Sequence, residues 1–599
     1  MSGEGADQCH NSIGSASATR LHGKEVAVRQ QPVTVLIEQK ASAAPDRADL
    51  LAEQVRRAGH EPVIVAGKSN AELLDRVVQA AAVGPVAVID SSFVTTQAML
   101  NMLLDQAWAG HSALVTPDRQ PAFDLAVRVG HKRVLSSATE FHRVTAPTHR
   151  ALGMLRIAPS REVVRTLLAA RPFAESQVMD LDGVGLLTVI LVRGNIPVAA
   201  VEPTGPTHRQ GGAVDDSLAT ITLRDDDAIR LARATRSNDG FYSTFVLRRF
   251  SRILTWVAVK RGWTPNQITV ASLIIAVIAA ALFADGSRTS LLVGAVLVQL
   301  AIIVDCSDGE VARYHSASSQ LGAWLDAATD RVKEYALYAG LAAGASNGQS
   351  WYWTAAMALV VMQTVRHLSD YNFVAIRATR ETADLSLPLI SRRAVHWVKR
   401  VIYLPIGERW LIISVGAALG SVKAVFLTLF VAGMFGLAYV IFGRIMRSAS
   451  WRRDVANSGC DIVERQLDGG PLLRRLVPID RHPLAGPLGW AVPSLLRGVE
   501  LGLVVIVGHQ HPVAYLWLFA VAFHHYDTMY RSLEGVEFPQ QLTDRGLGIE
   551  GRIALVALIA FGLPAEVAWF VGGWYFTAVL VGQASWQWAA SLRSSQRAR

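Results

Sequence analysis

The sequence predicts a polytopic α-helical membrane protein that carries a soluble α/β domain at its N-terminal end. Of the 599 residues, 51% are hydrophobic and 18% are charged, whereas about a quarter of the residues in a soluble chain are charged. The mean hydropathy is +0.28. Residues 1–260 look like an ordinary soluble sequence, and residues 264–590 are apolar in long blocks. This composition excludes a disordered, fibrous or disulfide-rich protein and argues against a fully soluble one.

The net charge and the cysteines narrow the class further. The net charge is +9, which in a soluble protein would favour nucleic-acid binding. Here the basic residues lie between apolar blocks, so orientation in a bilayer explains them better and we expect no nucleic-acid partner. Cys9, Cys306 and Cys460 show no metal-binding spacing and suit a reducing compartment. The first thirty residues contain no apolar run, so we expect no cleavable signal peptide.

The N-terminal part divides into a disordered tail over residues 1–30 and an α/β domain over residues 31–235. Short apolar runs alternate with helical periodicity, which predicts a parallel sheet with helices. We expect a hairpin later in the domain, with strands Gly185–Val192 and Pro197–Val201 around a Gly194-Asn195 turn. The earlier expected elements are the strands Val33–Ile37, Pro62–Ala66, Val86–Asp90 and Ala113–Thr116, and the helices Ala48–Ala58, Ala71–Ala82 and Thr95–Ala109.

Residues 236–263 connect this domain to the apolar blocks. Asp226–Arg236 reads as a charged helix that leads toward the membrane. Phe245–Lys260 is amphipathic and basic, which predicts a helix lying on an anionic leaflet. The alternative is a plain juxtamembrane linker.

The apolar blocks predict six spans followed by four more. If the N-terminal domain lies in the cytoplasm, the arginines and lysines fall mostly in the cytoplasmic loops. We therefore expect a plasma-membrane protein with both chain ends on the cytoplasmic side. Several blocks are shorter than the ~20 residues that a span needs. The expected spans lie near Gln267–Ala284, Leu291–Ala312, Leu321–Gly344, Trp351–Phe373, Trp410–Gly420, Ala424–Gly443, Leu488–Val507, Val513–Asp527, Ile553–Leu563 and Val567–Trp588.

Four aspartates within two predicted spans form the candidate active site. Asp305 and Asp308 are three residues apart on one helix, and Asp326 and Asp330 are four apart on the next, so each pair shares a helix face. A short turn joins the helices, so the pairs can converge at the cytoplasmic end. Converging carboxylates repel one another unless a cation lies among them, and oxygen ligands favour two Mg²⁺ or Mn²⁺ ions. The alternative is a network of buried polar groups that only packs the helices.

Small residues and one arginine accompany the aspartates. Gly309, Ala312 and Gly322 leave room for a ligand between the helices. Arg313 supplies a positive charge for a phosphate group. A transporter or channel would instead spread its carboxylates across the membrane depth.

Together these residues resemble the signature of the CDP-alcohol phosphatidyltransferases, Asp305-x2-Asp308-Gly309-x2-Ala312-Arg313-x8-Gly322-x3-Asp326-x3-Asp330. The resemblance covers about residues 240–446, with the membrane domain at 264–446, and Thr264-Pro265-Asn266-x2-Thr269 resembles the family's entry to the first helix. It implies a six-helix core, a homodimer, a cytoplasmic active site, and transfer of a phosphatidyl-type group from a CDP-linked lipid to a polar alcohol with release of CMP. By resemblance, the metal ligands are Asp305, Asp308, Asp326 and Asp330, with Asp330 as ligand or general base, and the CDP-binding positions are Asp308, Gly309, Ala312, Arg313 and Gly322.

The acceptor alcohol is predicted from basic residues and from a second resemblance. Ser237-Asn238-Asp239-Gly240-Phe241 with Arg248 and Arg249 resembles the junction of fused inositol-phosphate cytidylyltransferase/phosphotransferases. This favours an inositol phosphate or a similar polyol phosphate. The alternatives are a glycerol-phosphate-type acceptor, or a non-catalytic membrane scaffold or transporter. The candidate phosphate ligands are Arg377, Lys399, Arg400 and Arg409, which ordinary positive-inside charge explains equally well.

In the same comparison, residues 31–235 resemble a nucleotidyltransferase. A working enzyme needs a glycine-rich basic loop after its first strand to hold the triphosphate. This chain has no glycine from that strand until Gly59, so we expect a degenerate, inactive domain. Asp90 could end a strand as a metal ligand, but an aspartate there is often a helix N-cap.

Residues 447–599 form a second membrane region of four expected spans, which the six-helix family does not explain. It resembles an uncharacterised C-terminal domain fused to such transferases in actinobacteria. His524, His525 and Asp527 could bind a metal or could be polar residues at the end of a helix.

Overall fold

The computed structural model describes residues 33–39, 46–66, 69–105, 110–118, 125–130, 132–138, 143–175, 183–203, 207–209, 240–315, 320–380, 400–449, 463–470, 486–533 and 544–588, with a few residues between 227 and 235. The predicted tail over residues 1–30 and most of the predicted helix Asp226–Arg236 lie outside these ranges. The chain separates into two compact units, an α/β unit within Val28–Arg233 and a helical unit from Ala234 onward.

The α/β unit is a layered domain built on a mixed sheet of eight strands. The strand order is β2-β1-β3-β8-β5-β9-β7-β6. β1 is parallel to β2 and β3, β5 is parallel to β9, and β8 is antiparallel to both β3 and β5. The strands are β1 (Thr34–Gln39), β2 (Glu61–Ala66), β3 (Val86–Asp90), β5 (His111–Pro117), β6 (Ala126–Gly130), β7 (Arg133–Ser137), β8 (His149–Ile157) and β9 (Val198–Val201); β4 (Phe93–Thr95) pairs separately with β10 (Thr207–Arg209).

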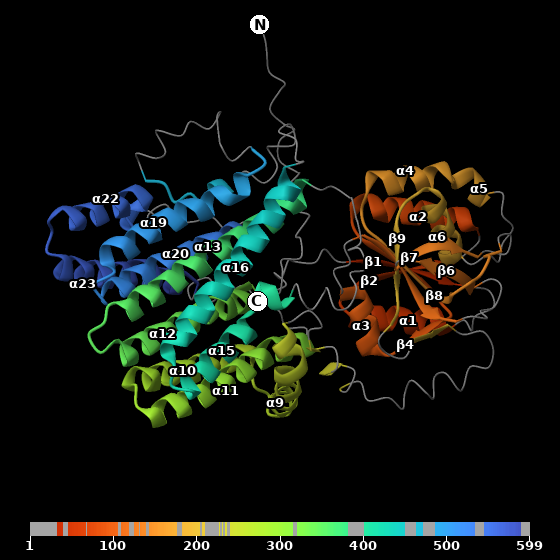
Figure 1. The fold of residues 1–599 in the computed structure, drawn as a ribbon. Coiled ribbons are helices and arrows are strands. Elements are labelled where there is room, and N and C mark those ends of the chain that lie inside the picture. Colours follow the sequence, from red (N-terminus) through yellow and green to blue (C-terminus); the bar gives the residue numbers. More distant parts are fainter. Residues whose placement is uncertain are drawn as a thin grey trace, which may run out of the picture. The chain divides into compact units, whose positions relative to one another are not determined.

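Helices cover both faces of this sheet, because successive side chains of a strand point to opposite sides. Leu36 packs with α2 (Asn70–Val83), α4 (Arg161–Ala169) and α6 (Gly183–Arg193), whereas its neighbours Val35 and Ile37 pack with α1 (Asp46–Arg57) and α3 (Gln97–Asp105). Figure 1 shows these two helical layers on either side of the strands, with α5 (Arg171–Glu175) beside α4.

The strands and helices predicted up to residue 117 are confirmed within a few residues. Two predictions are wrong. The sheet is mixed rather than parallel, because β6, β7 and β8 were not recognised. The predicted strand Gly185–Val192 is part of the helix α6, whose residues are nearly all buried. A short apolar run buried on all sides has no periodicity that separates a strand from a helix.

The helical unit begins with a basic amphipathic segment that leads into the apolar helices. A π-turn (Ser243–Leu247) runs into α9 (Arg248–Lys260), where the sequence predicts an amphipathic helix. The following helices are α10 (Pro265–Asp285), α11 (Arg288–Tyr314), α12 (Gln320–Ser346), α13 (Trp351–Arg380), α15 (Ile406–Ala418), α16 (Val422–Ser448), α19 (Val492–Gly508), α20 (Ala514–Leu533), α22 (Gly548–Phe561) and α23 (Ala565–Phe576), which continues as a π-turn over Thr577–Gly582.

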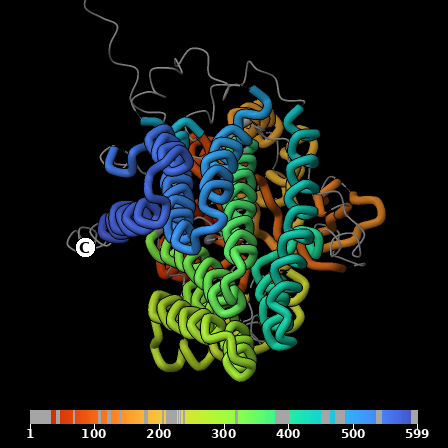
Figure 2. The backbone as a smooth tube through the Cα atoms, turned by 60° about the vertical axis from the view of Figure 1, so that its left-hand side comes forward, coloured from red at the N-terminus to blue at the C-terminus, as the bar shows by residue number. Residues whose placement is uncertain are grey.

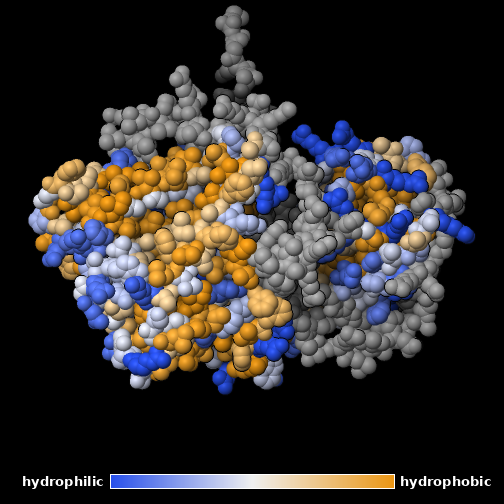
Figure 3. Space-filling model, in the orientation of Figure 1, coloured by the Kyte–Doolittle hydropathy of each residue, from blue (hydrophilic) through white to orange (hydrophobic). Residues whose placement is uncertain are grey.

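All ten predicted spans coincide with helices, and five of those helices are long and apolar enough to cross a membrane. These five are Pro265–Asp285, Arg288–Tyr314, Val422–Ser448, Gly489–Gly508 and Ala565–Trp588. α15 and α22 have 13 and 14 residues, fewer than a span needs. Large apolar side chains are exposed on the outer surfaces, for example Val431 on α16 and Trp574 on α23. Figure 3 shows hydrophobic residues spread over this unit, as in a membrane protein.

The C-terminal helices pack directly on the core helices. α13 lies beside α16 on one side and beside α19 and α20 on another (Figures 1 and 2). One continuous apolar cluster includes Tyr338 of α12, Met357 of α13, Trp410 of α15 and Trp517 of α20. The ten helices therefore form one compact unit, in which α12 has neighbours on both sides.

Candidate active site

Three of the four aspartates predicted as metal ligands converge between α11 and α12, which both pack on α10. One carboxylate oxygen each of Asp305, Asp308 and Asp326 lies within 4.8 Å of the other two. Asp308 is buried, and Asp305 and Asp326 are partly exposed. α11 and α12 have 27 residues each and both pack on α10, and the i,i+3 pair of α11 and the i,i+4 pair of α12 point toward the space between them. This arrangement offers oxygen ligands to a hard cation from two helices.

Asp330 is connected to this group by a lysine that the sequence analysis missed. Lys333 Nζ lies 3.2 Å from Asp330 Oδ1 and also pairs with Asp305. It donates to Ser272 Oγ of α10 at 3.2 Å. Lys333 is fully buried on an apolar helix, three residues after Asp330 and on the same face. Because a buried lysine in a span is expensive, its position could have identified it as a site residue.

The threonine of the family-like entry motif supports one of the ligands. Thr269 Oγ1 donates to Asp308 Oδ2 at 2.5 Å and to the Pro265 carbonyl at 3.1 Å. Thr264 caps α10, because it accepts from the backbone N–H of Gln267 while the Gln267 side chain accepts from the Thr264 N–H. The motif therefore fixes the start of α10 beside Asp308.

The positions that the resemblance assigns to CDP lie on the same two helices. A Cβ added at Gly309 would lie 3.0 Å from the Arg313 guanidinium, so glycine allows Arg313 to cover the backbone there. Arg313 Nε donates to the Ala234 carbonyl at 2.6 Å. Ala312 and Gly322 are partly exposed. Nucleotide binding by these residues stays a prediction.

A second missed carboxylate, Glu310, connects α9 to α11. Glu310 is fully buried and accepts from Arg248 at 2.6 Å, from Ser251 at 2.9 Å and from Thr255 at 2.6 Å. Arg248, which the sequence analysis placed with the basic residues of a membrane-surface helix, is therefore a buried partner of Glu310. The network holds α9 against the helix that carries Asp305 and Asp308.

The charges of the site fit a divalent cation. Four carboxylates lie near one another, and Lys333 supplies one positive charge beside Asp305 and Asp330. An excess of negative charge among buried groups is unfavourable unless a cation compensates it. Carboxylate oxygens without histidine or cysteine suit Mg²⁺ or Mn²⁺. The metal ligands would be Asp305, Asp308 and Asp326, with Asp330 beside them.

The basic residues predicted to bind the acceptor phosphate lie in different surroundings. Arg377 lies in the last turns of α13 and Arg400 just before α15, both half-buried, and Lys399 lies outside the described residues. Arg409 is buried and paired in a bidentate manner with Glu334, at 2.6 and 3.0 Å. It also donates to the Leu404 carbonyl at 2.9 Å. These bonds use three of its five N–H donors, and the role of Arg409 toward an acceptor stays a prediction.

Positive charge exceeds negative charge in the buried region beside α12 and α13. Arg331 Nη1 lies 3.2 Å from Glu334, and the Nε atom of Arg331 is buried with no hydrogen-bond acceptor among the described residues. Arg366 donates through Nη2 to the Tyr403 carbonyl, while its buried Nη1 likewise has none. In the described part of this region the arginines are Arg331, Arg366, Arg409 and Arg444, and the carboxylates at ion-pair distance from them are Glu334 and Asp370.

In the α/β unit, two carboxylates at the ends of parallel strands are bound by the protein itself. Glu38 of β1 accepts from the backbone N–H groups of Gly183 and Val184 at the start of α6, at 2.9 and 3.3 Å. Asp90 of β3 is fully buried and pairs with Arg209 of β10. The Asp90 side chain also accepts from the Ser92 N–H at 2.8 Å, as in a turn.

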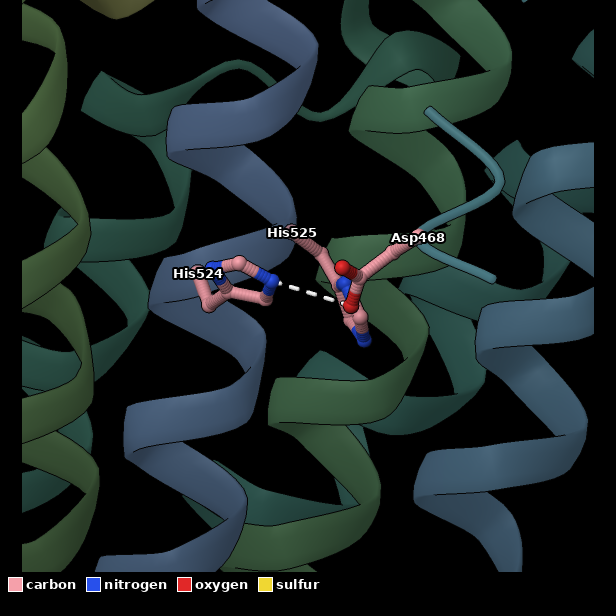
Figure 4. A group of neighbouring side chains, drawn as sticks. All are labelled: Asp468, His524 and His525. Atoms are coloured by element: carbon pink, nitrogen blue, oxygen red, sulfur yellow. Dashed lines mark hydrogen bonds and ion pairs between the residues drawn. The ribbon is translucent and has the colours of Figure 1, made fainter. Parts of the chain in front are cut away.

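A second group of potential metal ligands lies in the C-terminal helices. Asp468, His524 and His525 each offer an atom within 4.8 Å of the others. Figure 4 shows Asp468 facing His524, with His525 next along the same helix. The Nε2 atom of His524 lies 2.9 Å from Oδ2 of Asp468. Burial would raise the pKa of Asp468, but His524 and Arg552 hold that pKa well below its usual range.

Arginines already neutralise the carboxylates of this group. Arg552 donates to Asp468 Oδ2 at 2.7 Å and to Glu500 Oε1 at 2.5 Å. Arg497 lies 3.2 Å from Glu500, which also binds His525 at 2.8 Å. The two arginines already balance the two carboxylates, so a divalent ion would add uncompensated charge to a buried site. The described contacts therefore fit an ion-pair network better than a metal site. Asp527, grouped with these histidines in the sequence analysis, binds other partners.

Two family models match the chain, in separate regions. Residues 263–445 match the CDP-alcohol phosphatidyltransferase family, and residues 479–588 match a family of unknown function (DUF5941). The first region contains the aspartates of α11 and α12. The second contains most of the C-terminal ion-pair network.

Curated relatives are similar over part of their length. The chain is 30% identical over 207 residues to a "Bifunctional IPC transferase and DIPP synthase" from Thermococcus kodakarensis, covering 34% of this chain and 44% of that protein. It is 38% identical over 94 residues to a "Phosphatidylinositol phosphate synthase" from Mycolicibacterium smegmatis, covering 16% and 41%. The chain thus spans less than half the length of these two relatives. A solved phosphatidylinositol phosphate synthase from Mycobacterium tuberculosis, with CDP-DAG bound, has a TM-score of 0.24 at 22% identity, covering 32% of this chain and 91% of that one.

Proposed function

We propose that this protein, whose residues 263–445 form a CDP-alcohol phosphatidyltransferase domain, transfers a phosphatidyl-type group from a CDP-linked lipid to a polar alcohol and releases CMP. The observation that carries the proposal is the convergence of Asp305, Asp308 and Asp326 within 4.8 Å on facing helices. When bound there, Mg²⁺ or Mn²⁺ would supply positive charge to the diphosphate and to the leaving CMP.

The chain's own residues supply the remaining chemistry. A hydroxyl of the acceptor attacks the β-phosphorus of the CDP-linked lipid, a new P–O bond forms, and the diphosphate P–O bond breaks with its electron pair leaving on CMP. Asp330 takes the hydroxyl proton as general base. Lys333 neutralises part of the negative charge of Asp330 and Asp305 through its ion pairs. Thr269 holds Asp308 from α10 through a hydrogen bond.

We infer that the acceptor carries a phosphate, as an inositol phosphate or similar polyol phosphate does. The support is the excess of arginine over carboxylate beside α12 and α13, together with the buried Arg331 Nε and Arg366 Nη1 atoms. Buried donors without acceptors are costly, so a ligand phosphate would compensate them. A glycerol phosphate would satisfy the same donors, so the comparison of acceptors must decide between them. Arg377 and Arg400 stay candidates for binding the same phosphate.

The proposal extends to the setting of the enzyme. We place it in the plasma membrane as a homodimer, with the α/β domain and the active site in the cytoplasm. The α/β domain is proposed to be inactive as a nucleotidyltransferase. Nucleotides bind at the carboxyl ends of parallel strands, where Glu38 already caps α6 and Asp90 pairs with Arg209.

Charge-removing substitutions test the proposal. Asp326→Asn and Asp330→Asn are expected to abolish CMP release from CDP-diacylglycerol while the protein stays folded, as shown by a cooperative thermal unfolding transition. The matched control is Asp285→Asn, which changes an exposed aspartate at the end of α10 and should keep full activity. Full activity in Asp330→Asn would remove Asp330 as the general base, and full activity in Asp326→Asn would contradict the proposed site.

A further inference from the structure

Helix α12 carries catalytic carboxylates on one face and is bound by the C-terminal helices on another. Trp324 lies two residues before Asp326 and is buried. Its indole N–H donates to Asp527 Oδ1 of α20 at 2.9 Å. The same oxygen accepts the indole N–H of Trp588 at 3.0 Å, and Arg531 donates to Asp527 Oδ2 at 2.8 Å. One buried carboxylate therefore joins α12 to α20 and to the last described residue of the chain.

Aromatic packing surrounds this carboxylate. The rings of Trp324 and Trp588 are stacked, with centroids 5.0 Å apart and planes 20° apart. The Arg531 guanidinium lies 4.9 Å from the Trp588 ring centroid. Asp527 and Arg531 neutralise one another, and the indole donors satisfy the remaining oxygen. Apolar side chains would suffice to pack two helices in a membrane, so a charged group here is better explained by a need for one fixed arrangement.

A second contact binds the same helix farther along. The Tyr515 hydroxyl of α20 donates to the Tyr335 carbonyl of α12 at 2.7 Å. An α-helix rises 1.5 Å per residue, so Trp324 and Tyr335 are about 16 Å apart along α12. Asp326 and Asp330 both lie between these two contacts. Slippage of α12 by one residue would turn it by about 100° and move Asp326 away from Asp305 and Asp308.

We propose that the C-terminal helices, in the region that matches the family of unknown function, serve to fix α12 in the register that directs Asp326 and Asp330 toward the metal and the substrate. Asp527 is the central positioning residue, and it acts through Trp324. This inference rests on the proposed function for its catalytic consequence. Its structural consequence, a defined affinity of the aspartates for a divalent ion, can be measured without turnover.

The test uses full-length protein in nanodiscs and the variants Asp527→Ala and Asp527→Asn. The first removes both acceptor oxygens, and the second keeps the Oδ1 acceptor. The readouts are Mn²⁺ affinity by electron paramagnetic resonance, kcat, and the KM for CDP-diacylglycerol. Asp527→Ala is expected to weaken Mn²⁺ binding and lower kcat by about tenfold or more, as losses behind metal ligands do. Asp527→Asn should recover most of both values.

A matched control separates positioning from general stability. Trp569 of α23 is fully buried, 5.1 Å from Trp517 between ring centroids, and makes its ring contacts inside the C-terminal region. Trp569→Phe should lower the thermal unfolding midpoint but leave Mn²⁺ affinity unchanged. If Asp527→Ala does not fold, Trp588→Phe, which keeps the stacked ring and removes one donor, should weaken Mn²⁺ binding by a smaller factor.

The inference is overturned if folded Asp527→Ala, or Trp588→Phe in its place, binds Mn²⁺ as the wild type does. It is also overturned if Trp569→Phe loses Mn²⁺ affinity in proportion to its loss of stability. Wild-type protein that binds Mn²⁺ in an Asp527-dependent manner but releases no CMP would support the positioning role and contradict the proposed reaction.

Discussion

Replacing Arg552 with methionine tests whether the charged cluster of the C-terminal helices is an ion-pair network or a metal site. Arg552 bridges Asp468 and Glu500 at 2.7 and 2.5 Å, and all three side chains are buried. Methionine keeps an apolar chain of similar length but leaves the two carboxylates without their shared cation. The cluster then loses one positive charge.

The magnitude follows from the remaining contacts. Removing one partner from a buried ion pair costs about 3–5 kcal/mol. Arg497 still lies 3.2 Å from Glu500, and His524 still lies 2.9 Å from Asp468. We therefore expect a loss near the lower end, about 3 kcal/mol. The double variant Arg552→Met/Glu500→Met restores the charge balance between Arg497 and Asp468, so it should recover part of the loss.

The assay is unfolding followed by tryptophan fluorescence in detergent, with and without EDTA or Zn²⁺. An ion-pair network predicts that EDTA leaves the wild-type midpoint unchanged and that Arg552→Met lowers it. If EDTA lowers the wild-type midpoint and the purified protein holds one equivalent of zinc, the reasoning from charge balance is wrong. It is equally wrong if Arg552→Met costs less than about 1 kcal/mol.

Three further outcomes follow from individual contacts. Lys333→Gln removes a cation that competes with the metal for Asp305 and Asp330. Mn²⁺ should therefore bind about tenfold more tightly, a gain of about 1.4 kcal/mol. Unchanged Mn²⁺ affinity in an electron paramagnetic resonance titration would exclude this competition. Glu310→Gln leaves Arg248 buried without a carboxylate partner, at a cost to stability of about 3–5 kcal/mol. Hydrogen–deuterium exchange followed by mass spectrometry should then show faster exchange of the α9 amides than in the wild type. Unchanged exchange would count against the network. Burial lowers the pKa of His111 from 6.5, although Glu162 opposes the shift. As pH falls, the His111 imidazole therefore takes up a proton at a higher pH in the unfolded state than in the folded state. The α/β unit should then lose stability as pH falls below about 6.5, and the His111→Gln variant should lose less stability over the same range. Equal losses in the two proteins would contradict this.

Most helices and the first strands could be predicted from the sequence, because long apolar runs and hydrophobic patterns with a period of 2 or 3.6 residues are local signals. The strands β1 to β3 and the ten helices predicted as spans were indicated by such patterns, and five of those helices are long and apolar enough to cross a membrane. The helix α6 and the strands β6 to β8 were missed. The run Gly183–Arg193 is buried on all sides, and its helical state depends on contacts such as the capping of Gly183 by Glu38, 145 residues earlier.

The candidate site divides in the same way. Asp305, Asp308, Asp326 and Asp330 were recognisable because their spacing puts them on helix faces. Lys333 and Glu310 were not selected, since their roles depend on partners on other helices. Asp468 lies 56 residues from His524, and no local pattern connects them. The ion pair of Arg409 with Glu334 also required the structure, because the two residues lie 75 positions apart in the sequence.

The most direct test of the central claim is the lipid product formed by purified protein in nanodiscs with CDP-diacylglycerol and Mg²⁺ or Mn²⁺. Inositol phosphate, glycerol phosphate, other polyol phosphates and the corresponding free alcohols are supplied one at a time, and lipids and CMP are measured by mass spectrometry. The account predicts CMP and a phosphatidyl polyol phosphate in equal amounts, only with a phosphorylated acceptor and a divalent ion, and neither product in Asp326→Asn. CMP release with free alcohols alone would contradict the assigned acceptor, and no release with any acceptor would contradict the proposed transferase activity.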